Sequence, residues 1–347
     1  MKRITVLIFA LLLIISCSKE YVPRNIENIE IQEFKMDSTS IRAIEVIDSK
    51  TVYFAGSKGD ISFTNDSGKS WTTEYITYQD SIVPHFRSLA KNKDAFFALS
   101  IANPALLYKI SKEKTALVYK EEHEKVFYDA LQFFDDGLHG IAVGDPTSSC
   151  ASVILTSDGG ETWQKLSCEN LPKFEDGEAF FAASNTNIKT LGSTVWIASG
   201  GKKARVLKSD DFGKTWQIYN TPIIQGNGPQ GIYSIDFANK NNGIAIGGDY
   251  SKPQENKANK SITNDGGKTW TLVANVKNPN YKSCVQYVPN TNGKEVFAVG
   301  KTGISFSNNG GKTWKEVSKD SYYAIQFVDK NTAWLSGNNK VGKLILE

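Results

Sequence analysis

The stretch Thr64–Trp71, which reads Thr-Asn-Asp-Ser-Gly-Lys-Ser-Trp, occurs five times in the chain with small changes. Its pattern is Ser/Thr-x-Asp-x-Gly-x-Ser/Thr-Trp. The other copies lie at residues 156–163, 209–216, 263–270 and 307–314, the last with Asn309 in place of the aspartate. Self-similarity at a spacing of tens of residues is the signature of a repeat architecture. This stretch is therefore the strongest indication of the overall architecture in the sequence.

A second feature, a short apolar run that ends in a small residue, also recurs along the chain. Its seven copies lie at residues 52–56, 96–100, 141–144, 195–200, 244–247, 296–300 and 333–337. The sixth repeat reads as four strands, at 284–288, 296–299, 303–307 and from Trp314 onward. Short strands bounded by Gly, Asn and Asp indicate an all-β protein, and four-stranded units repeated around a ring form a β-propeller. The sequence predicts seven blades of four antiparallel strands.

The last repeat ends after its third strand, at residues 342–346. We expect residues 29–34 to supply the missing fourth strand and to close the ring, because pairing the two ends removes an open sheet edge. Residues 28–347 are thus predicted to form a single propeller.

The repeated stretch, called the turn motif below, is predicted to be structural. Its aspartate can accept backbone N–H groups within a turn, its glycine can adopt positive φ, and its tryptophan can bury a large ring. A catalytic aspartate is the alternative, but five similar copies around a ring cannot form one active site. The structural residues are Asp66, Trp71, Asp158, Trp163, Asp211, Trp216, Asp265, Trp270, Asn309 and Trp314.

The first residues are predicted to be a targeting segment. Lys2 and Arg3 precede an apolar run, residues 4–15, that is too short for a bilayer span of about 20 residues. The run ends at Ser16-Cys17, which resembles a bacterial lipobox. The resemblance implies a signal peptide over residues 1–16, a lipid on Cys17 and a tether over residues 17–27. An ordinary signal peptide that happens to contain a cysteine is the alternative. The protein is then expected in the bacterial cell envelope, held to the membrane by its lipid, most simply at the outer membrane on its periplasmic or surface side.

Charge and cysteine usage exclude several functions. Loss of Lys2 and Arg3 lowers the formal charge from +3 to +1, which argues against a nucleic-acid partner.

In an exported protein Cys150 and Cys168 are candidates for a disulfide, whereas Cys284 is predicted to be a small buried residue. No histidine or cysteine spacing typical of a metal site is present, and no cofactor is expected.

The face of the ring opposite the turn motifs is the predicted binding face. The connections at 145–152, 201–205 and 248–260, and those at 167–178 and 221–232, are long and all belong to that face. Long loops are where function usually lies. Aligning the repeats places a set of polar residues at the start of the inner strands, around the central channel: Arg42, Arg87, Asp129, Glu178, Tyr233, Ser283 and Tyr323, with Arg205 nearby. The guanidinium groups suit a carboxylate or phosphate; a ring that neutralises itself as ion pairs is the alternative.

The turn motif matches the Asp-box, or BNR, repeat, and the match extends over nearly all of residues 28–347. Sialidases carry Asp-boxes, and that resemblance implies a glycoside hydrolase in which Arg42, Arg87 and Arg205 bind a carboxylate, Asp129 is an acid and Tyr323 a nucleophile. The chain lacks the Arg-Ile-Pro element of sialidases, and sialidases have six blades. The repeats more closely resemble photosystem II assembly-factor propellers and their non-photosynthetic bacterial relatives, which bind other proteins. We therefore expect a lipid-anchored, non-catalytic binding or assembly scaffold for a protein, peptide or glycan, with a sialidase-like hydrolase as the alternative.

Overall fold

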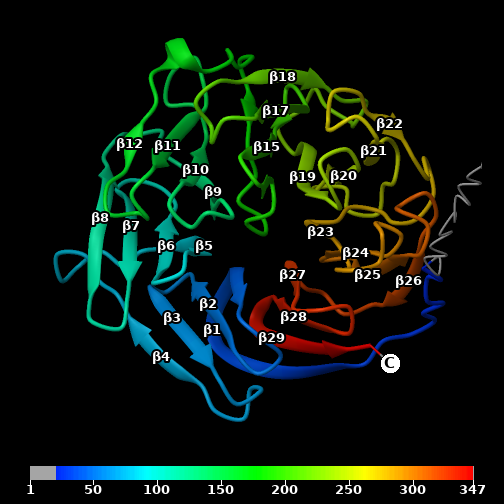
Figure 1. The fold of residues 1–347 in the computed structure, drawn as a ribbon, viewed down its shortest axis with the longest axis horizontal. Helices are drawn as coiled ribbons and strands as arrows, with labels where there is room; N and C mark the ends of the chain where they lie inside the picture. The colour runs from blue at the N-terminus through cyan, green and yellow to red at the C-terminus, as the bar shows by residue number, and fades with distance from the viewer. Residues whose placement is uncertain (1–20, 347) are drawn as a thin grey trace, which may run out of the picture.

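The computed structural model describes residues 21–346, and they form an all-β ring around a central axis (Figure 1). The predicted signal peptide and Cys17 lie outside the described residues. One 3-10 helix, η1 (Cys168–Asn170), accompanies the strands. Within residues 21–346 no helix is long and apolar enough to span a bilayer.

Four sheets have four antiparallel strands each; the first three follow one another around the ring, and the strands β19–β22 lie between the third and the fourth. The first is β5 (Phe86–Lys91), β6 (Phe96–Ser100), β7 (Ala105–Ile110) and β8 (Thr115–Glu121). The second is β9 (Tyr128–Phe133), β10 (Gly140–Gly144), β11 (Ser152–Thr156) and β12 (Gln164–Lys165). The third is β14 (Ile188–Leu191), β15 (Thr194–Ala198), β17 (Arg205–Ser209) and β18 (Gln217–Asn220). The fourth is β23 (Cys284–Tyr287), β24 (Val296–Gly300), β25 (Gly303–Ser307) and β26 (Lys315–Ser318).

Two sheets are larger. One joins β19 (Gln230–Phe237), β20 (Gly243–Asp249), β21 (Lys260–Thr263) and β22 (Thr271–Leu272) to the short strands β13 (Glu178–Ala179) and β16 (Gly200–Gly201). The other has the order β27-β28-β29-β1-β2-β3-β4. Its members are β27 (Ala324–Phe327), β28 (Thr332–Ser336), β29 (Asn338–Ile345), β1 (Ile31–Val46), β2 (Val52–Gly56), β3 (Asp60–Thr64) and β4 (Thr72–Tyr75).

Strand β1 connects the two ends of the chain. Residues Ile31 to Lys35 pair with β29, and residues Ile41 to Val46 pair with β2. Phe34 of the first half packs against Trp71 and Trp334, with ring centroids 6.1 and 5.9 Å away. Backbone pairing and aromatic packing thus hold the first and last strands side by side.

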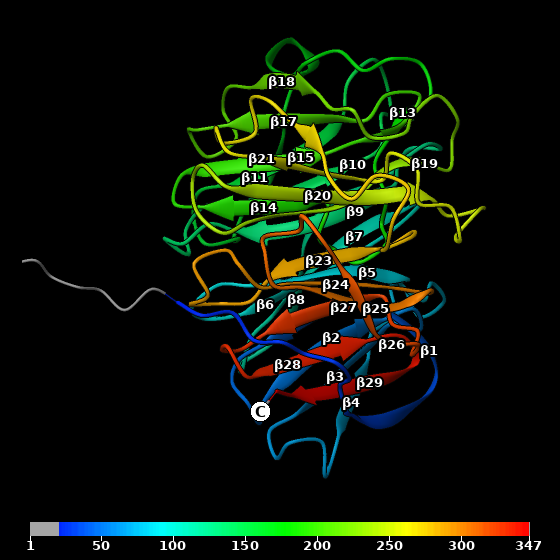
Figure 2. The ribbon, with the colours of Figure 1, turned by 90° about the vertical axis from the view of Figure 1, so that its right-hand side faces the viewer.

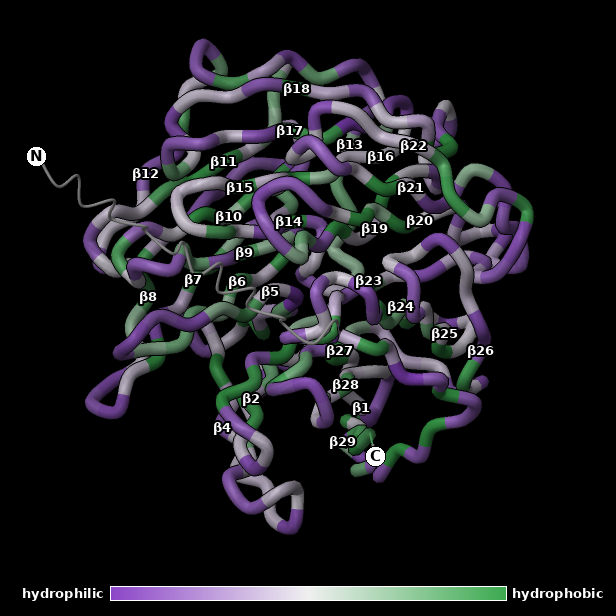
Figure 3. The backbone as a smooth tube through the Cα atoms, turned by 45° about the vertical axis from the view of Figure 1, so that its right-hand side comes forward, coloured by the Kyte–Doolittle hydropathy of each residue, from purple (hydrophilic) through white to green (hydrophobic). Residues whose placement is uncertain are grey.

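The hydrophobic core lies between neighbouring sheets. The second strand of each sheet is almost wholly buried, as in β10, β15, β24 and β28. In Figure 3 the strands within the ring are predominantly green and the turns around it purple, so apolar residues gather where sheets pack face to face. Burial of both faces explains why these strands read as continuous apolar runs.

The turn motif closes on itself through side-chain hydrogen bonds. In the copy at 156–163, Asp158 Oδ1 accepts from Thr156 Oγ1 (2.7 Å) and from the Thr162 N–H (3.0 Å), and Asp158 Oδ2 accepts from Thr162 Oγ1 (2.6 Å). Gly160 has a φ of +84°, and its N–H donates to Thr156 Oγ1 at 3.0 Å. The indole of Trp163 donates to the Gly160 carbonyl. The Asp158 carboxylate therefore makes its hydrogen bonds within its own turn.

The antiparallel order gives the ring two distinct faces. The five turn motifs begin where β3, β11, β17, β21 and β25 end, and we call this end of the ring the motif face. The inner strands begin, and the second strands end, at the opposite side, which we call the loop face.

Candidate binding site

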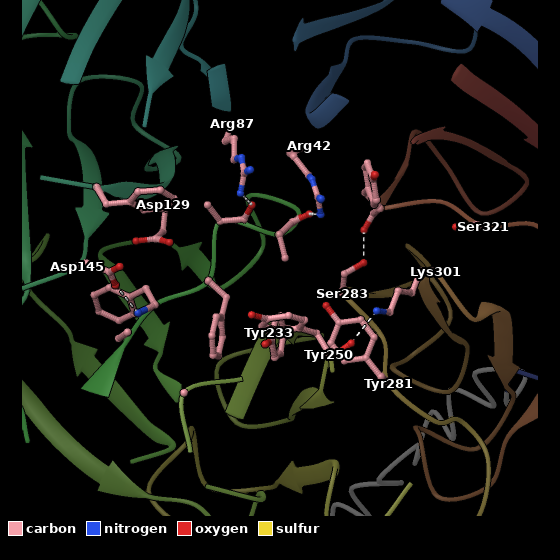
Figure 4. A pocket seen from close by; sticks show the side chains of 18 residues that line it. Arg42, Arg87, Asp129, Asp145, Tyr233, Tyr250, Tyr281, Ser283, Lys301 and Ser321 are labelled. Carbon is pink, nitrogen blue, oxygen red and sulfur yellow. Dashed lines mark hydrogen bonds between the residues drawn. The ribbon is translucent and has the colours of Figure 1, made fainter. Parts of the chain in front are cut away.

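A cavity of about 610 Å³ lies at the loop face, in the centre of the ring (Figure 4). Its polar and aromatic lining residues are Arg42, Arg87, Phe127, Asp129, Asp145, Phe180, Phe181, Tyr233, Tyr250, Tyr281, Ser283, Lys301, Ser321 and Tyr323. No residue of a turn motif lines it.

Repeated β-bulges direct four of these side chains. Arg42 is the extra residue between the pairs Ile41–Gly56 and Ala43–Ala55. Register shifts of the same kind leave Arg87, Asp129 and Tyr233 unpaired. A bulge bends its strand and re-aims one side chain, and here each re-aimed side chain lines the cavity.

A glycine at the end of the second strand makes room for the bulges at Asp129 and Tyr233. A Cβ on Gly144 would come within 2.3 Å of the Phe127 carbonyl oxygen, and one on Gly247 within 2.0 Å of the Gly231 carbonyl oxygen. Backbone approaches so close that only glycine fits. At Gly144 and Gly247 the glycine that ends the apolar run is thus required by the bulge that faces it, whereas Ser100 takes this place opposite the Arg87 bulge.

The segment Phe180–Thr186, called the crossing segment, passes over the centre of the ring beneath the cavity. Asn185 donates to the Leu89 carbonyl (2.8 Å) and accepts from the Leu131 N–H (2.8 Å), while Ser184 Oγ donates to the Ser283 carbonyl (2.6 Å). These contacts reach three different sheets, so the crossing segment is fixed as a floor. A second cavity of about 110 Å³, lined by Asn185 and Thr186 among others, lies on its other side.

Arg42 and Arg87 point side by side into the cavity (Figure 4). Arg42 donates to the Ala183 carbonyl (3.3 Å) and lies over the Tyr323 ring, 3.6 Å from its centroid. Arg87 donates to the Ala182 carbonyl (3.4 Å), and its Nε lies 3.4 Å from His85 Nε2. Among residues 21–346 neither guanidinium forms an ion pair, and Arg42 Nε is buried without a hydrogen-bond partner.

The surroundings of Arg42 and Arg87 disfavour the positive charge of both guanidinium groups. Burial lowers the pKa of Arg42, and burial together with the charge of Arg42 lowers the pKa of Arg87. An arginine remains protonated in proteins, so two neighbouring cations stay charged here without an acidic partner. Such an arrangement attracts an anion, because buried charges are normally paired.

Two carboxyl groups lie on the neighbouring wall. Asp129 is fully buried, and neither of its oxygens has a partner with hydrogen-bond geometry within the described residues. Burial, and then the charge of Asp145, raises the pKa of Asp129 well above its usual range. Burial raises the pKa of Asp145 to about 6, although its Oδ1 accepts from the Phe180 N–H at 2.7 Å. Burial therefore disfavours the ionised form of both carboxyl groups, and the three cationic side chains Arg42, Arg87 and Lys301 outnumber them in the lining.

Aromatic rings form a third wall of the cavity. Phe181 stacks on Tyr233 at 3.9 Å between centroids, and Tyr281 meets Tyr233 edge-on at 4.9 Å. Lys301 Nζ donates to the Tyr250 carbonyl (2.6 Å) and lies 5.8 Å from the Tyr281 ring centroid. Rigid aromatic surface next to cations suits an extended chain with both apolar and anionic groups.

The cavity brings together six of the eight residues that the repeat alignment placed around the channel. Those six are Arg42, Arg87, Asp129, Tyr233, Ser283 and Tyr323. Glu178 and Arg205 lie elsewhere: Arg205 Nη2 and Nε donate to the Glu178 carboxylate at 2.5 and 2.9 Å, and neither residue lines the cavity. The expectation that they join the ring is wrong, and so the three arginines of the sialidase resemblance do not converge.

The crossing segment explains this error. The inner strand of its sheet is β14, which begins at Ile188, whereas Glu178 lies in β13 and pairs with Gly201 of β16. Thr186, two residues before β14, takes the place assigned to Glu178 and contacts Ser234 Oγ at 2.7 Å. The crossing segment separates β13 from β14, a detour that spacing alone does not reveal.

Sequence reasoning missed several cavity residues, of which Asp145, Lys301 and Tyr281 matter most. A signal for two of them exists, since Asp145 and Lys301 each directly follow the terminal glycine of the repeated apolar run. Tyr281 is not marked by any repeated pattern.

The remaining sequence-based candidates lie outside the cavity. The structure joins Cys150 to Cys168 by a disulfide, with their Cα atoms 5.6 Å apart, and Cys284 is a buried free thiol. Among residues 21–346 no group of three or more His, Cys, Asp or Glu side chains is placed to hold a metal ion.

Comparison with known proteins places the chain by fold. No protein-family model and no curated protein matches the sequence. The solved structure of YCF48 bound to D1 peptide has a TM-score of 0.66 at 12% identity and covers 93% of this chain and 100% of that one. YCF48 from Cyanidioschyzon merolae has a TM-score of 0.60 at 13% identity, with 91% and 98% covered. A catalytically inactive virginiamycin B lyase from Staphylococcus aureus, solved with quinupristin, has a TM-score of 0.61 at 14% identity, with 92% and 100% covered. At these identities the likeness shows the fold alone, and it confirms the prediction of an all-β propeller.

Proposed function

We propose that this protein is a lipid-anchored β-propeller of the bacterial cell envelope that acts as a non-catalytic binding or assembly scaffold. Its loop-face cavity holds an acidic segment of a protein or peptide partner. The proposal includes a signal peptide over residues 1–16, a lipid on Cys17, an outer-membrane location, and a seven-bladed ring of Asp-box repeats that β1 closes.

One observation carries the binding role. Arg42 and Arg87 lie side by side in the cavity, partly buried and without an acidic partner among the described residues. Two guanidinium groups that contact only carbonyl oxygens, an imidazole and a ring have several N–H groups free for a carboxylate. The alternative of a self-neutralised ring is weakened, because no ion pair of the described residues includes Arg42 or Arg87, and burial raises the pKa of Asp129 and so disfavours its carboxylate.

The rest of the lining favours a polypeptide as the ligand. The stacked rings of Phe181, Tyr233 and Tyr281 offer apolar surface, and the fixed crossing segment gives a rigid floor. A rigid site binds a flexible segment without a further ordering cost of its own. The solved structure of YCF48 with D1 peptide is one case in which a propeller of this fold holds a peptide.

The test compares proteins captured from the cell envelope by three forms of the full chain. After crosslinking in intact cells and affinity purification, Arg42→Ala/Arg87→Ala should lose the partners that the wild type captures. The matched control is Lys214→Ala/Lys268→Ala, which removes two exposed positive charges from the motif face. Thermal unfolding of all three forms shows that the fold is intact. Identical partners for all three forms would contradict the binding role of the arginines.

A further inference from the structure

The described chain begins on the motif face, held there by a buried ion pair. Arg24 Nε and Nη2 donate to Glu295 Oε2 at 2.9 and 2.5 Å, and the Arg24 N–H donates to Glu295 Oε1 at 2.8 Å. Tyr21 also donates to Glu295. The Glu295 side chain is 0% exposed, so a carboxylate buried in the ring is neutralised by the segment that precedes it.

Further contacts fix the same segment over residues 24–29. Arg24 Nη2 donates to the Lys330 carbonyl (2.7 Å), and Asn308 donates to the Arg24 carbonyl (3.3 Å). Ile26 and Ile29 pack against the apolar core next to β26 and β27. Tyr21–Ile29 is therefore a docked part of the propeller, and we call it the docked segment.

The docking residues identify the face. Glu295 directly precedes β24, Asn308 directly follows β25, and Lys330 lies between β27 and β28. All three positions belong to the motif face. The cavity residue Lys301 follows β24 at its other end, on the loop face. In Figure 2 the blue start of the described chain lies at the left side of the ring, and the yellow loop after β20 projects at the right.

The distance along the chain from Cys17 to the docked segment is short. Four residue steps separate Cys17 from Tyr21, and even a fully extended chain spans only about 14 Å over that length. If the chain were free as far as Ile31, fourteen steps would span about 50 Å and the ring could take any orientation. Docking removes most of this freedom.

We propose that the motif face lies against the lipid bilayer and that the loop-face cavity opens away from it. This inference rests on the lipid anchor of the proposed function. It assigns the motif face to a lipid surface and leaves the cavity open to partners in the aqueous compartment. The Arg24–Glu295 pair is then the element that sets the orientation.

A lipid-borne crosslinker tests the orientation directly. The chain from Cys17 onward is joined by native ligation at its N-terminal cysteine to a thioester lipid, and is bound to phosphatidylcholine vesicles that contain a lipid with an amine-reactive headgroup. Peptide mass analysis then compares exposed lysines of the motif face, Lys69 and Lys214, with exposed lysines of the loop face, Lys58 and Lys202. We expect modification of the motif-face pair to exceed that of the loop-face pair several-fold. Equal modification of both pairs, or the reverse order, would overturn the orientation.

A variant checks that the docked segment is the cause. Arg24→Ala/Glu295→Gln removes both members of the ion pair, so no unpaired charge remains buried. The preference for motif-face lysines should fall toward equal modification, with vesicle binding unchanged; an undiminished preference would contradict the role of the ion pair. The mass of the N-terminal peptide from cells reports separately on the native anchor. An unlipidated Cys17 would refute the anchor, whereas the ligated chain measures the orientation of the ring in either case.

Discussion

The turn motifs of the motif face and the cavity of the loop face hold charged side chains in opposite ways. On the motif face each aspartate is satisfied within its own turn; Asp158, for example, accepts three hydrogen bonds from Thr156 and Thr162. On the loop face Arg42 and Arg87 lack acidic partners, and both Asp129 oxygens lack hydrogen-bond partners, within the described residues. Buried polar groups are normally paired, so unpaired ones mark a place where structure alone does not explain the residue.

The pKa values show the same contrast. Hydrogen bonds from the Ser70 hydroxyl and N–H hold the pKa of Asp66 at about 2, which favours its ionised form. Burial raises the pKa of Asp145 to about 6, which disfavours its ionised form. The aspartates of the turn motifs stabilise their turns, whereas the loop-face cavity keeps charged groups in unfavourable surroundings. This difference separates a structural repeat from a binding site, although both consist of the same residue types.

The largest expected decrease in the free energy of unfolding concerns β1, which pairs with both β29 and β2. Phe34→Ala removes a ring that packs against Trp71 and Trp334 and should lower the free energy of unfolding by about 3 kcal/mol. Deleting residues 21–35 should lower it further, because β29 loses its partner strand. Denaturant unfolding measures both effects, and Lys35→Ala on the exposed side of the same strand is the control. An unchanged midpoint in the deletion would argue against ring closure by β1.

A smaller change of opposite sign, an increase in the free energy of unfolding, is expected when a charge is removed from the loop-face cavity. The folded pKa of Asp145, about 6, lies above its ordinary value of 3.8, so its contribution to stability is present below pH 4 and is lost as the pH rises through 6. Asp145→Asn should therefore raise the free energy of unfolding at pH 7.5 by about 2–3 kcal/mol. It should have little effect at pH 3.

Unfolding of wild type and Asp145→Asn across pH 3–8 checks this prediction. Asp249→Asn is a suitable control, because hydrogen bonds from Ser251 outweigh burial and lower the pKa of Asp249. If the free energy of unfolding had the same pH dependence in wild type and Asp145→Asn, the ionised Asp145 would not destabilise the folded protein, and this prediction would be wrong.

The sequence predicted the regular part of the molecule well and the irregular part less well. The strands expected at 284–288, 296–299 and 303–307 correspond to β23, β24 and β25 within a residue or two. This agreement follows from the repeats, because a turn motif or an apolar run marks the same point in each repeat that contains it. Where the spacing holds, the inner positions Arg42, Arg87, Asp129 and Tyr233 were found as well.

Prediction failed where one repeat departs from the spacing. The crossing segment separates β13 from β14, so Glu178 was assigned to a position that Thr186 occupies. Its hydrogen bonds reach Leu89, Leu131 and Ser283, which are distant in sequence, and no local pattern encodes them. The floor of the cavity is therefore a tertiary feature that a single sequence does not reveal.

The smallest expected change in the free energy of unfolding concerns a turn motif of the motif face. Asp158→Ala removes an acceptor for three hydrogen bonds at an exposed turn and should lower the free energy of unfolding by about 1–2 kcal/mol. Asp158→Asn should change it by less than about 0.5 kcal/mol, since a neutral amide keeps most of these bonds. The copy with Asn309 illustrates this: its Oδ1 accepts from the Thr313 N–H (2.9 Å), and its amide donates to Thr313 Oγ1 (2.7 Å).

Unfolding at acid pH separates the contribution that the negative charge of Asp158 makes to stability from that of its hydrogen-bonding shape. Burial tends to raise the pKa of Asp158, but the Thr162 hydroxyl and N–H outweigh it and hold the pKa at about 2. With a folded pKa below the ordinary 3.8, the carboxylate adds stability above pH 4 that is lost as the pH falls toward 2. Asp158→Asn should flatten this part of the pH profile and leave partner capture unchanged. If Asp158→Asn instead lost the partners that depend on Arg42 and Arg87, the motif face would share in binding, and the division between the two faces would not hold.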